Sequence, residues 1–314
     1  MAKLDPNRGV PPGVPLKLEG LRPGQSLELL KELHILTREG RINQDSRRKL
    51  KQVNHLFQLI EPLLLELESG TGSGSDAGGT PPRGLTVADH GAGKSYLGFI
   101  LYDLFFRHRA GGHMVGVETR QELVLHSQQL AKRLGFQRMS FLNLSVAQAA
   151  TSPALPQQID VVTALHACDT ATDDAIAFGL HKGARCMVLV PCCQAELARL
   201  LNAGKALSLG RTPLAELWRH PLHTREMGSQ LTNVLRCLYL EARGYSVSVT
   251  ELVGWEHSMK NELILARHTG RRNRAAGQRL RELLDQFGLM QLLGNRFVLD
   301  DTDAPTPATV PAPR

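Results

Sequence analysis

The sequence predicts an α/β fold in which a mostly parallel sheet ends in an antiparallel hairpin and follows an N-terminal helical segment. Two observations carry this prediction. Between residues 85 and 190, short runs of β-branched and apolar residues alternate with segments of helical periodicity, which is typical of a parallel sheet covered by helices. Residues 247–253 and 262–266 then form two strand-like runs without a helix between them, so we expect them to pair antiparallel.

Composition bounds the class of protein. The 314 residues are 42% hydrophobic, so the chain can bury a sizeable core. The 37 basic and 30 acidic residues leave a net charge of +7, a moderate excess that favours a polyanionic partner without identifying one. The chain has neither an apolar stretch long enough to span a membrane nor an apolar signal core, and its five cysteines form no CxxC pair. We therefore expect a cytoplasmic, soluble protein with reduced thiols.

Shifts in composition divide the chain into five expected parts. Apolar residues recur at helical spacing from Ser26 to Glu68, and a Gly/Ser-rich stretch follows them. The chain ends in an Arg-rich segment and a Pro/Ala/Thr tail. The expected parts are an N-terminal helical segment (1–68), a flexible linker (69–80), the α/β domain (81–270), an Arg-rich helical extension (271–299) and a disordered tail (300–314).

Within the α/β domain the expected elements alternate in order. Glycine follows three of the expected helices, at Gly135, Gly183 and Gly244, where it favours a helix end. Five strands before a terminal hairpin is the ordering of a Rossmann-like class I methyltransferase sheet. The expected strands are 85–88, 115–117, 139–144, 160–165 and 186–190, and the expected helices are 94–107, 121–134, 171–182 and 226–243.

The first strand runs into the glycine-rich turn Ala88-Asp89-His90-Gly91-Ala92-Gly93-Lys94-Ser95, which opens a helix. Such a turn binds nucleotide-like ligands, because glycines admit the ligand to the backbone and the helix start presents free N–H groups. A dinucleotide fingerprint is excluded, since Tyr96 stands where the third glycine is needed. A phosphate-binding loop would use Lys94 and Ser95, but Ala88 replaces its first glycine and Asp89 would oppose a triphosphate.

S-adenosylmethionine suits this turn better, because its sulfonium and amine are cationic and favour the acidic Asp89. Glu118, at the end of the second strand, can accept both ribose hydroxyl groups, and residues after the third strand are expected near the adenine. The plain alternative, in which Asp89 forms a turn and Glu118 is a solvated carboxylate, stays open. The expected cofactor residues are Asp89, Gly91, Gly93, Glu118, Asn143 and Leu144.

A second group of polar residues follows the fourth strand, in His166-Ala-Cys-Asp-Thr-Ala-Thr-Asp-Asp174. The carboxyl ends of parallel strands share one edge with the cofactor loop, so we expect the acceptor there. His166 or Asp169 could accept a proton from, or orient, a hydroxyl or amine nucleophile, and Asp173 completes the predicted catalytic set. In the alternative interpretation Asp169, Thr170 and Asp173 only cap the following helix.

Cys192 and Cys193 follow the fifth strand and admit three uses. Small packed core residues are the common case. Covalent catalysis, as in C5-cytosine methyltransferases, is disfavoured because the reactive cysteine there follows the fourth strand. A metal site with His166 and Cys168 is disfavoured because adjacent cysteines cannot easily bind one tetrahedral ion, and we predict no metal.

The chain resembles the ATD-motif methyltransferase-domain family over residues 41–266. That family includes eukaryotic methyltransferase-like proteins of the type-25 group and is similar to tRNA 2′-O-ribose methyltransferases with an HxCGxATD motif. The resemblance implies a class I fold and S-adenosylmethionine; Asp169 stands where the tRNA enzymes carry glycine, so the acceptor stays open. The matching segments are DHGAGKSYLG (89–98), HACDTATDDA (166–175), VPCCQ (190–194) and WEHSMKNELI (255–264).

Two basic segments, Arg41–Lys51 and Arg267–Arg281, are suited to phosphate contacts, although a solvated basic helix face is the plain alternative. Aromatic residues are 5% of the chain and are not interleaved with these segments, so stacking on unpaired bases is not expected. We predict an S-adenosylmethionine-dependent methyltransferase that modifies RNA, either tRNA or rRNA. A protein methyltransferase of the same fold and a non-catalytic module that binds S-adenosylmethionine or RNA are the alternatives.

Overall fold

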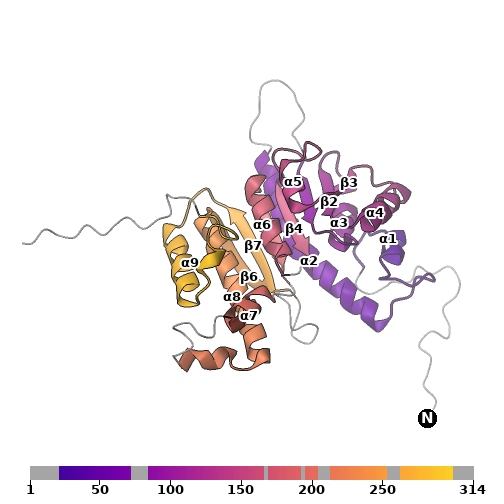
Figure 1. The fold of residues 1–314 in the computed structure, drawn as a ribbon. Coiled ribbons are helices and arrows are strands. Elements are labelled where there is room, and N and C mark those ends of the chain that lie inside the picture. Colours follow the sequence, from indigo (N-terminus) through magenta and orange to yellow (C-terminus); the bar gives the residue numbers. More distant parts are fainter. Residues whose placement is uncertain are drawn as a thin grey trace, which may run out of the picture.

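The computed structural model describes residues 21–71, 84–165, 169–191, 195–203, 213–252 and 262–299. Their seven-stranded sheet has the order β3-β2-β1-β4-β5-β7-β6 (Figure 1). β1 to β5 run parallel, and β7 pairs antiparallel with β5 and β6, which confirms the predicted sheet and hairpin. The strands are β1 (Thr86–His90), β2 (His113–Glu118), β3 (Met139–Asn143), β4 (Val161–Leu165), β5 (Cys186–Val190), β6 (Tyr245–Glu251) and β7 (Glu262–His268).

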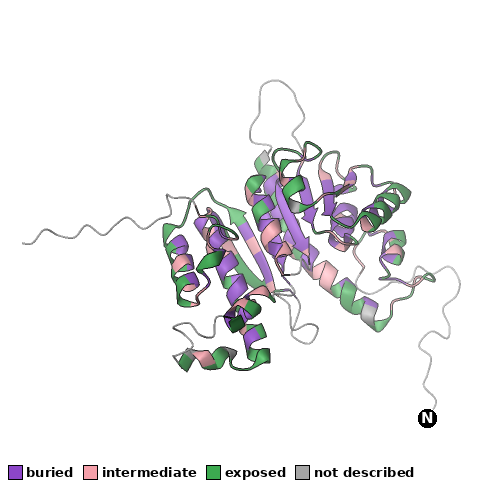
Figure 2. Cartoon of the chain, in the orientation of Figure 1, coloured by how far each residue is buried: buried purple, intermediate pink, exposed green. Residues whose placement is uncertain are grey.

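Helices cover both faces of the sheet, so its central strands are buried along their length (Figure 2). Neighbouring residues of β1, Val87 and Ala88, belong to opposite apolar cores, because successive strand side chains point to opposite faces. One core packs under α1 (Leu27–Glu32), α2 (Gln44–Thr71), α3 (Tyr96–Leu101), the π-helical turn η1 (Tyr102–Phe106) and α4 (Gln121–Arg133). The other packs under α5 (Val146–Thr151), α6 (Ala171–His181), α7 (Glu196–Ala203), α8 (Pro221–Ala242), α9 (Arg274–Gln286) and the 3-10 turn η4 (Met290–Leu292).

The N-terminal segment is helical, and its helices pack against the sheet of the α/β domain. Leu56, Phe57 and Ile60 of α2 are buried in the core that lies against β1. This helix also continues to Thr71, past the expected boundary at residue 68. Residues 1–20, the rest of the expected linker (72–80) and the expected tail (300–314) lie outside the described residues.

The expected Arg-rich extension is likewise part of the second core. Leu280 and Leu284 of α9 are buried against α8, and the ring of Phe297 packs edge-on against Tyr239 with centroids 5.5 Å apart. Arginines therefore cover only the outer side of this helix. None of the helices in the described ranges has the length and apolar character of a membrane span.

Several elements differ from the expected ones. β1 extends through Asp89 and His90, which the sequence analysis places in a turn. Two short helices, α5 and α7, and the 3-10 turn η3 (Pro213–Trp218) are not predicted. The start of α5 carries a readable signal, because Ser145 and Gln148 form a reciprocal capping box.

The hydroxyl group of Tyr245 supplies a test of the second core. It donates to the buried carbonyl oxygen of Ala184 at 2.7 Å. Tyr245→Phe is expected to lower the free energy of unfolding by about 1–3 kcal/mol, because that acceptor loses its donor. Tyr96→Phe is the matched control, since no partner of the Tyr96 hydroxyl is seen within the described residues. Chemical denaturation measures both, and equal midpoints would contradict the assignment.

Candidate active site

Asp89 is a buried carboxylate at the carboxyl end of the central strand, with only 2% of its surface exposed. Its two oxygens accept hydrogen bonds from the hydroxyl groups of Ser95 and Thr163, each at 3.0 Å. Burial raises the pKa of this carboxyl to about 6, although the two hydroxyl groups oppose the rise. Asp89 therefore offers the loop a negative charge in a site of low dielectric.

The glycines of the loop shape an open turn above Asp89. Gly91 and Gly93 have φ values of +66° and +57°, a region that side chains other than glycine rarely adopt. A Cβ atom at Gly91 would meet nothing within 4 Å, so this side of the turn is open. Ser95 also has a positive φ, of +51°, and its buried hydroxyl group is engaged by Asp89. A Mg²⁺-binding role for Ser95, as a phosphate-binding loop requires, is therefore disfavoured.

Glu118 ends β2 and is tied to the glycine loop. Its carboxylate accepts the backbone N–H of Gly93 at 2.7 Å and the backbone and guanidinium groups of Arg120 at 3.0–3.3 Å. Burial alone would raise the pKa of this carboxyl, but the hydrogen bonds from Arg120 and Gly93 outweigh it and lower the pKa to about 2. The Arg120 side chain is 59% exposed, so it can leave the carboxylate when ribose hydroxyl groups approach.

His90 is a site residue that the sequence analysis quotes without assigning. Its ring lies beneath the loop on the face opposite Asp89, tilted against Phe178 at a centroid distance of 5.2 Å. Burial lowers the pKa of the ring to about 4, against the opposing charge of Glu118, so the ring is neutral at physiological pH. Within the described residues neither ring nitrogen has a hydrogen-bond partner. The position of His90 directly after Asp89 in the glycine-rich motif is the sequence feature that identifies it as a site residue.

The residues expected near the adenine lie after β3. The side-chain amide of Asn143 donates to the carbonyl oxygens of Glu118 and Thr119, at 3.1 and 2.7 Å. Asn143 thereby joins the ends of β2 and β3, while Leu144 packs at the margin of the second core. Both residues are at the predicted edge, next to Glu118.

The acidic residues expected to face the acceptor are occupied by structural partners. Asp169 has a φ of +51°, and its Oδ1 accepts the backbone N–H groups of Ala195 and Glu196, each at 3.1 Å. It thus caps α7, whereas Thr170 at the start of α6 makes no side-chain capping bond. The alternative in which Asp169 and Thr170 cap α6 is therefore wrong.

Asp173 holds two arginines. Its carboxylate accepts Arg236 at 2.7 and 2.8 Å and Arg296 at 2.9 Å. The side chain of Arg236 is fully buried, and it also donates to the carbonyl oxygen of Asp169 at 2.7 Å. This network fixes the chain that follows β4, so both carboxylates act on the backbone around the site.

His166, Cys168, Cys192 and Cys193 lie outside the described residues. The described thiols, Cys186 and Cys237, are free, and burial raises their pKa values to about 11 and about 12. No cluster of potential metal ligands occurs in the part of the chain that the structure describes.

Comparisons with known proteins place a methyltransferase domain on these residues. A family model described as a methyltransferase domain matches residues 48–200, which contain the glycine loop and the ends of β1 to β5. This match confirms the prediction of a methyltransferase that depends on S-adenosylmethionine. No curated protein matches the chain.

Solved structures give weak similarities. Magnesium protoporphyrin IX methyltransferase from Synechocystis, with bound S-adenosylhomocysteine, has 17% identity and a TM-score of 0.42, covering 77% of this chain and 93% of that one. An rRNA methylase from Streptococcus thermophilus has 9% identity and a TM-score of 0.35, covering 59% and 86%. Fibrillarin from Aeropyrum pernix has 12% identity and a TM-score of 0.36, covering 59% and 66%. At these TM-scores they decide nothing about the acceptor.

The residues at the carboxyl edge fit S-adenosylmethionine. When bound, this cofactor supplies an electrophilic methyl group on a cationic sulfur. Asp89 and Glu118 place two carboxylates at the edge, and the neutral His90 adds no positive charge against the sulfonium. The open side of Gly91 leaves room for the ligand to approach the backbone. Glu118 would hold the ribose, and Asp89 would act on the cation.

A comparison of S-adenosylmethionine with S-adenosylhomocysteine, whose sulfur carries no charge, tests the role of Asp89. Asp89→Asn is expected to weaken the binding of S-adenosylmethionine by roughly tenfold more than that of S-adenosylhomocysteine, because both ligands carry the cationic amine but only S-adenosylmethionine carries the sulfonium charge. In the wild type, the preference for S-adenosylmethionine should grow as the pH rises from 5 to 7, since the Asp89 carboxyl ionises near its pKa of about 6. Calorimetry at each pH measures both, and an unchanged ratio would exclude this role.

Glu118→Gln provides the contrasting variant. Both ligands carry the same ribose, so their affinities should fall together by about 10- to 150-fold, as expected for loss of a hydrogen bond to a charged group. The same titrations measure this. If Glu118→Gln instead lowers the affinity for S-adenosylmethionine much more than that for S-adenosylhomocysteine, Glu118 lies near the sulfur and not at the ribose.

Asp173→Asn distinguishes a structural carboxylate from a catalytic one. The change is expected to lower the free energy of unfolding by about 3 kcal/mol, because the buried Arg236 loses its charged partner. Asp174→Asn is the neighbouring control and should stay within about 0.5 kcal/mol. Denaturation and S-adenosylhomocysteine titration give the readouts. An Asp173→Asn protein with full stability and abolished methyl transfer would restore the catalytic interpretation.

Proposed function

We propose that this methyltransferase modifies RNA, which docks on the basic segment at the start of α2. Nucleophilic attack by an RNA oxygen or nitrogen would form the new bond to the methyl carbon as the carbon–sulfur bond breaks, releasing S-adenosylhomocysteine and a proton. His166, the residue after β4, is the proposed proton acceptor or orienting group. Asp169 and Asp173 are proposed to support it through the backbone contacts described above.

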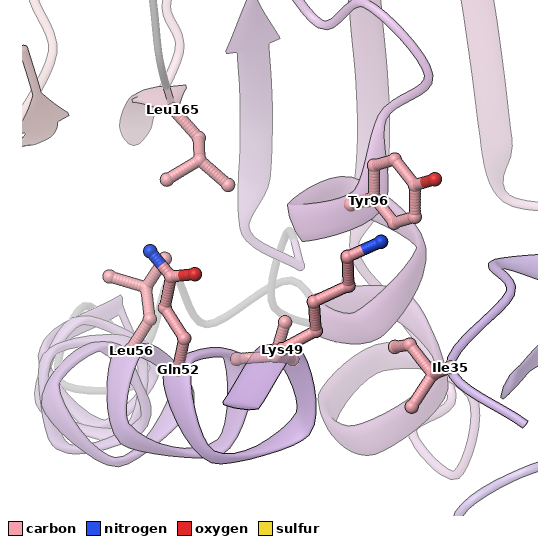
Figure 3. Close-up of a pocket in the computed structure, with 7 residues that line it drawn as sticks. Ile35, Lys49, Gln52, Leu56, Tyr96 and Leu165 are labelled. Carbon is pink, nitrogen blue, oxygen red and sulfur yellow. The ribbon is translucent and has the colours of Figure 1, made fainter. Parts of the chain in front are cut away.

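One observation carries this proposal. Lys49, in the basic segment Arg41–Lys51, lines a pocket together with Leu165, the last residue of β4 (Figure 3). The segment therefore reaches the carboxyl edge of the sheet, where we propose that the cofactor and the acceptor meet. Arg41, Arg47 and Lys51 are also exposed. Exposed cations beside a methyl-transfer site suit a phosphate backbone.

The second basic segment lies at the opposite edge of the sheet. Arg267 of β7 is in register with Cys186, the first residue of β5. A five-residue strand separates the two edges by about 16 Å, so these arginines cannot line the reaction site. Arg267 also pairs with Glu66 at 2.7 Å, and Arg279 pairs with Glu241 at 3.4 Å. An RNA would meet this segment only by extending past the sheet.

Two finer expectations belong to the proposal. The free thiols of the buried Cys186 and the half-buried Cys237 suit a reducing compartment such as the cytoplasm. Membership of the ATD-motif group is supported by the resemblance of residues 166–175, of which the structure describes the part from Asp169 onward.

Transfer of radiolabelled methyl groups to cell extract tests the acceptor class. Label should be removed by nuclease and should survive protease; the reverse result would refute the RNA acceptor.

The double variant Arg47→Gln with Lys51→Gln tests the docking segment. It should reduce kcat/KM for RNA and lower the slope of log RNA affinity against log salt concentration by about 1.4, as expected for two lost contacts on a single strand. Arg271→Gln with Arg274→Gln removes the same charge from the far edge and should have the smaller effect.

A further inference from the structure

A small pocket beside the cofactor loop combines apolar walls with three polar side chains. Its volume is about 230 Å³. Figure 3 shows Lys49 and Gln52 extending from α2 into the space below Tyr96 and Leu165. Within the described residues, none of the polar side chains has a hydrogen bond or ion pair. The walls are Ile35, Val53, Leu56 and Leu165, and the polar residues are Lys49, Gln52 and Tyr96.

The pocket lies beside the glycine loop and the end of β4. Tyr96 begins α3 directly after Ser95, whose hydroxyl group binds Asp89. Leu165 ends β4 and lies two residues beyond Thr163, which is in register with Asp89. With Glu118 on β2 as the proposed ribose ligand, a cofactor that extends across β1 would bring its sulfonium toward β4. The pocket is therefore on the acceptor side of the cofactor.

We propose that this pocket receives one unpaired nucleobase of the RNA acceptor, an inference that rests on the function proposed above. The aliphatic walls and the Tyr96 ring match the apolar faces of a base. The amide of Gln52 both donates and accepts, so it can read the hydrogen-bonding edge of that base. The ammonium group of Lys49 is left for the phosphate.

The size and charge of the pocket disfavour other occupants. Its 230 Å³ is below the roughly 300–1,000 Å³ of pockets for drug-sized ligands, so it suits a single ring system. The positive charge of Lys49 repels a lysine or arginine side chain, which a protein acceptor would present. The sequence analysis expects no stacking because aromatic residues do not interrupt the basic segments. The proposed pocket departs from that expectation, because Tyr96 comes from another helix and lines the same pocket as Lys49.

Mononucleotide binding tests the pocket in the full chain saturated with S-adenosylhomocysteine, which keeps adenine out of the cofactor site. The probes are the four nucleoside 5′-monophosphates and the matching nucleosides, followed by saturation-transfer NMR. Tyr96→Ala should lower the affinity for every nucleotide by roughly 5- to 150-fold, because stacking on the ring is lost. Tyr96→Phe, which keeps the ring, should bind nucleotides as the wild type does. Lys49→Met should weaken the monophosphates by up to about fivefold and leave the nucleosides unchanged. Lys132→Met, a control at an exposed lysine of α4 outside both basic segments, should affect neither.

Gln52→Leu should alter the relative affinities of the four bases, which a purely structural residue would not do. Unchanged S-adenosylhomocysteine affinity shows that each variant is folded.

The pocket proposal is refuted if the wild-type protein labels RNA while Tyr96→Ala and Lys49→Met keep full nucleotide binding. The proposed RNA function would then still stand. Label that enters only protein overturns the RNA function itself. Protein label that disappears in Tyr96→Ala would assign the pocket to an amino-acid side chain.

Discussion

An ionisable carboxylate inside the central strand is the constraint around which the catalytic edge is arranged. Burial makes the charged form of Asp89 costly, so this residue contributes less to stability as the pH rises from its ordinary pKa of 3.8 to about 6. Hydroxyl groups from two directions offset that cost, Thr163 from β4 and Ser95 from the loop. To reach Asp89, Ser95 takes a left-handed backbone conformation immediately before α3. Gly98 on that helix must lack a side chain, because a Cβ there would overlap the Ser95 hydroxyl group.

The four acidic residues singled out from the sequence serve two different purposes. Asp89 and Glu118 end neighbouring parallel strands and lie at the open turn. Asp169 and Asp173 instead hold α7, Arg236 and Arg296, which come from distant parts of the chain. A carboxylate near a strand end can therefore either face a ligand site or hold neighbouring segments together, and the groups that contact it determine which. Here the second pair joins the start of α6 to α7 and α8.

The sheet order was accessible from the sequence because alternating strands and helices, followed by two adjacent strands, admit few topologies. The local motif also indicates that Asp89 and Glu118 lie near the carboxyl ends of β1 and β2, although β1 continues two residues past its expected end. The sequence analysis failed where the deciding contact was distant. Nothing near Asp173 announces Arg236, 63 positions away. His90 falls in the expected glycine-rich turn, whereas in the structure it ends β1 and its ring packs against Phe178 of α6.

The packing of α2 also determines where this protein can be divided. Composition places a boundary near residue 81, and a fragment starting there would retain all seven strands. It would nevertheless leave bare the sheet face that Leu56, Phe57 and Ile60 cover. A contiguous apolar surface of that kind favours self-association over solubility. The smallest unit suitable for expression or crystallisation therefore includes α1 and α2, although a domain search based on glycine-rich spacers would discard both.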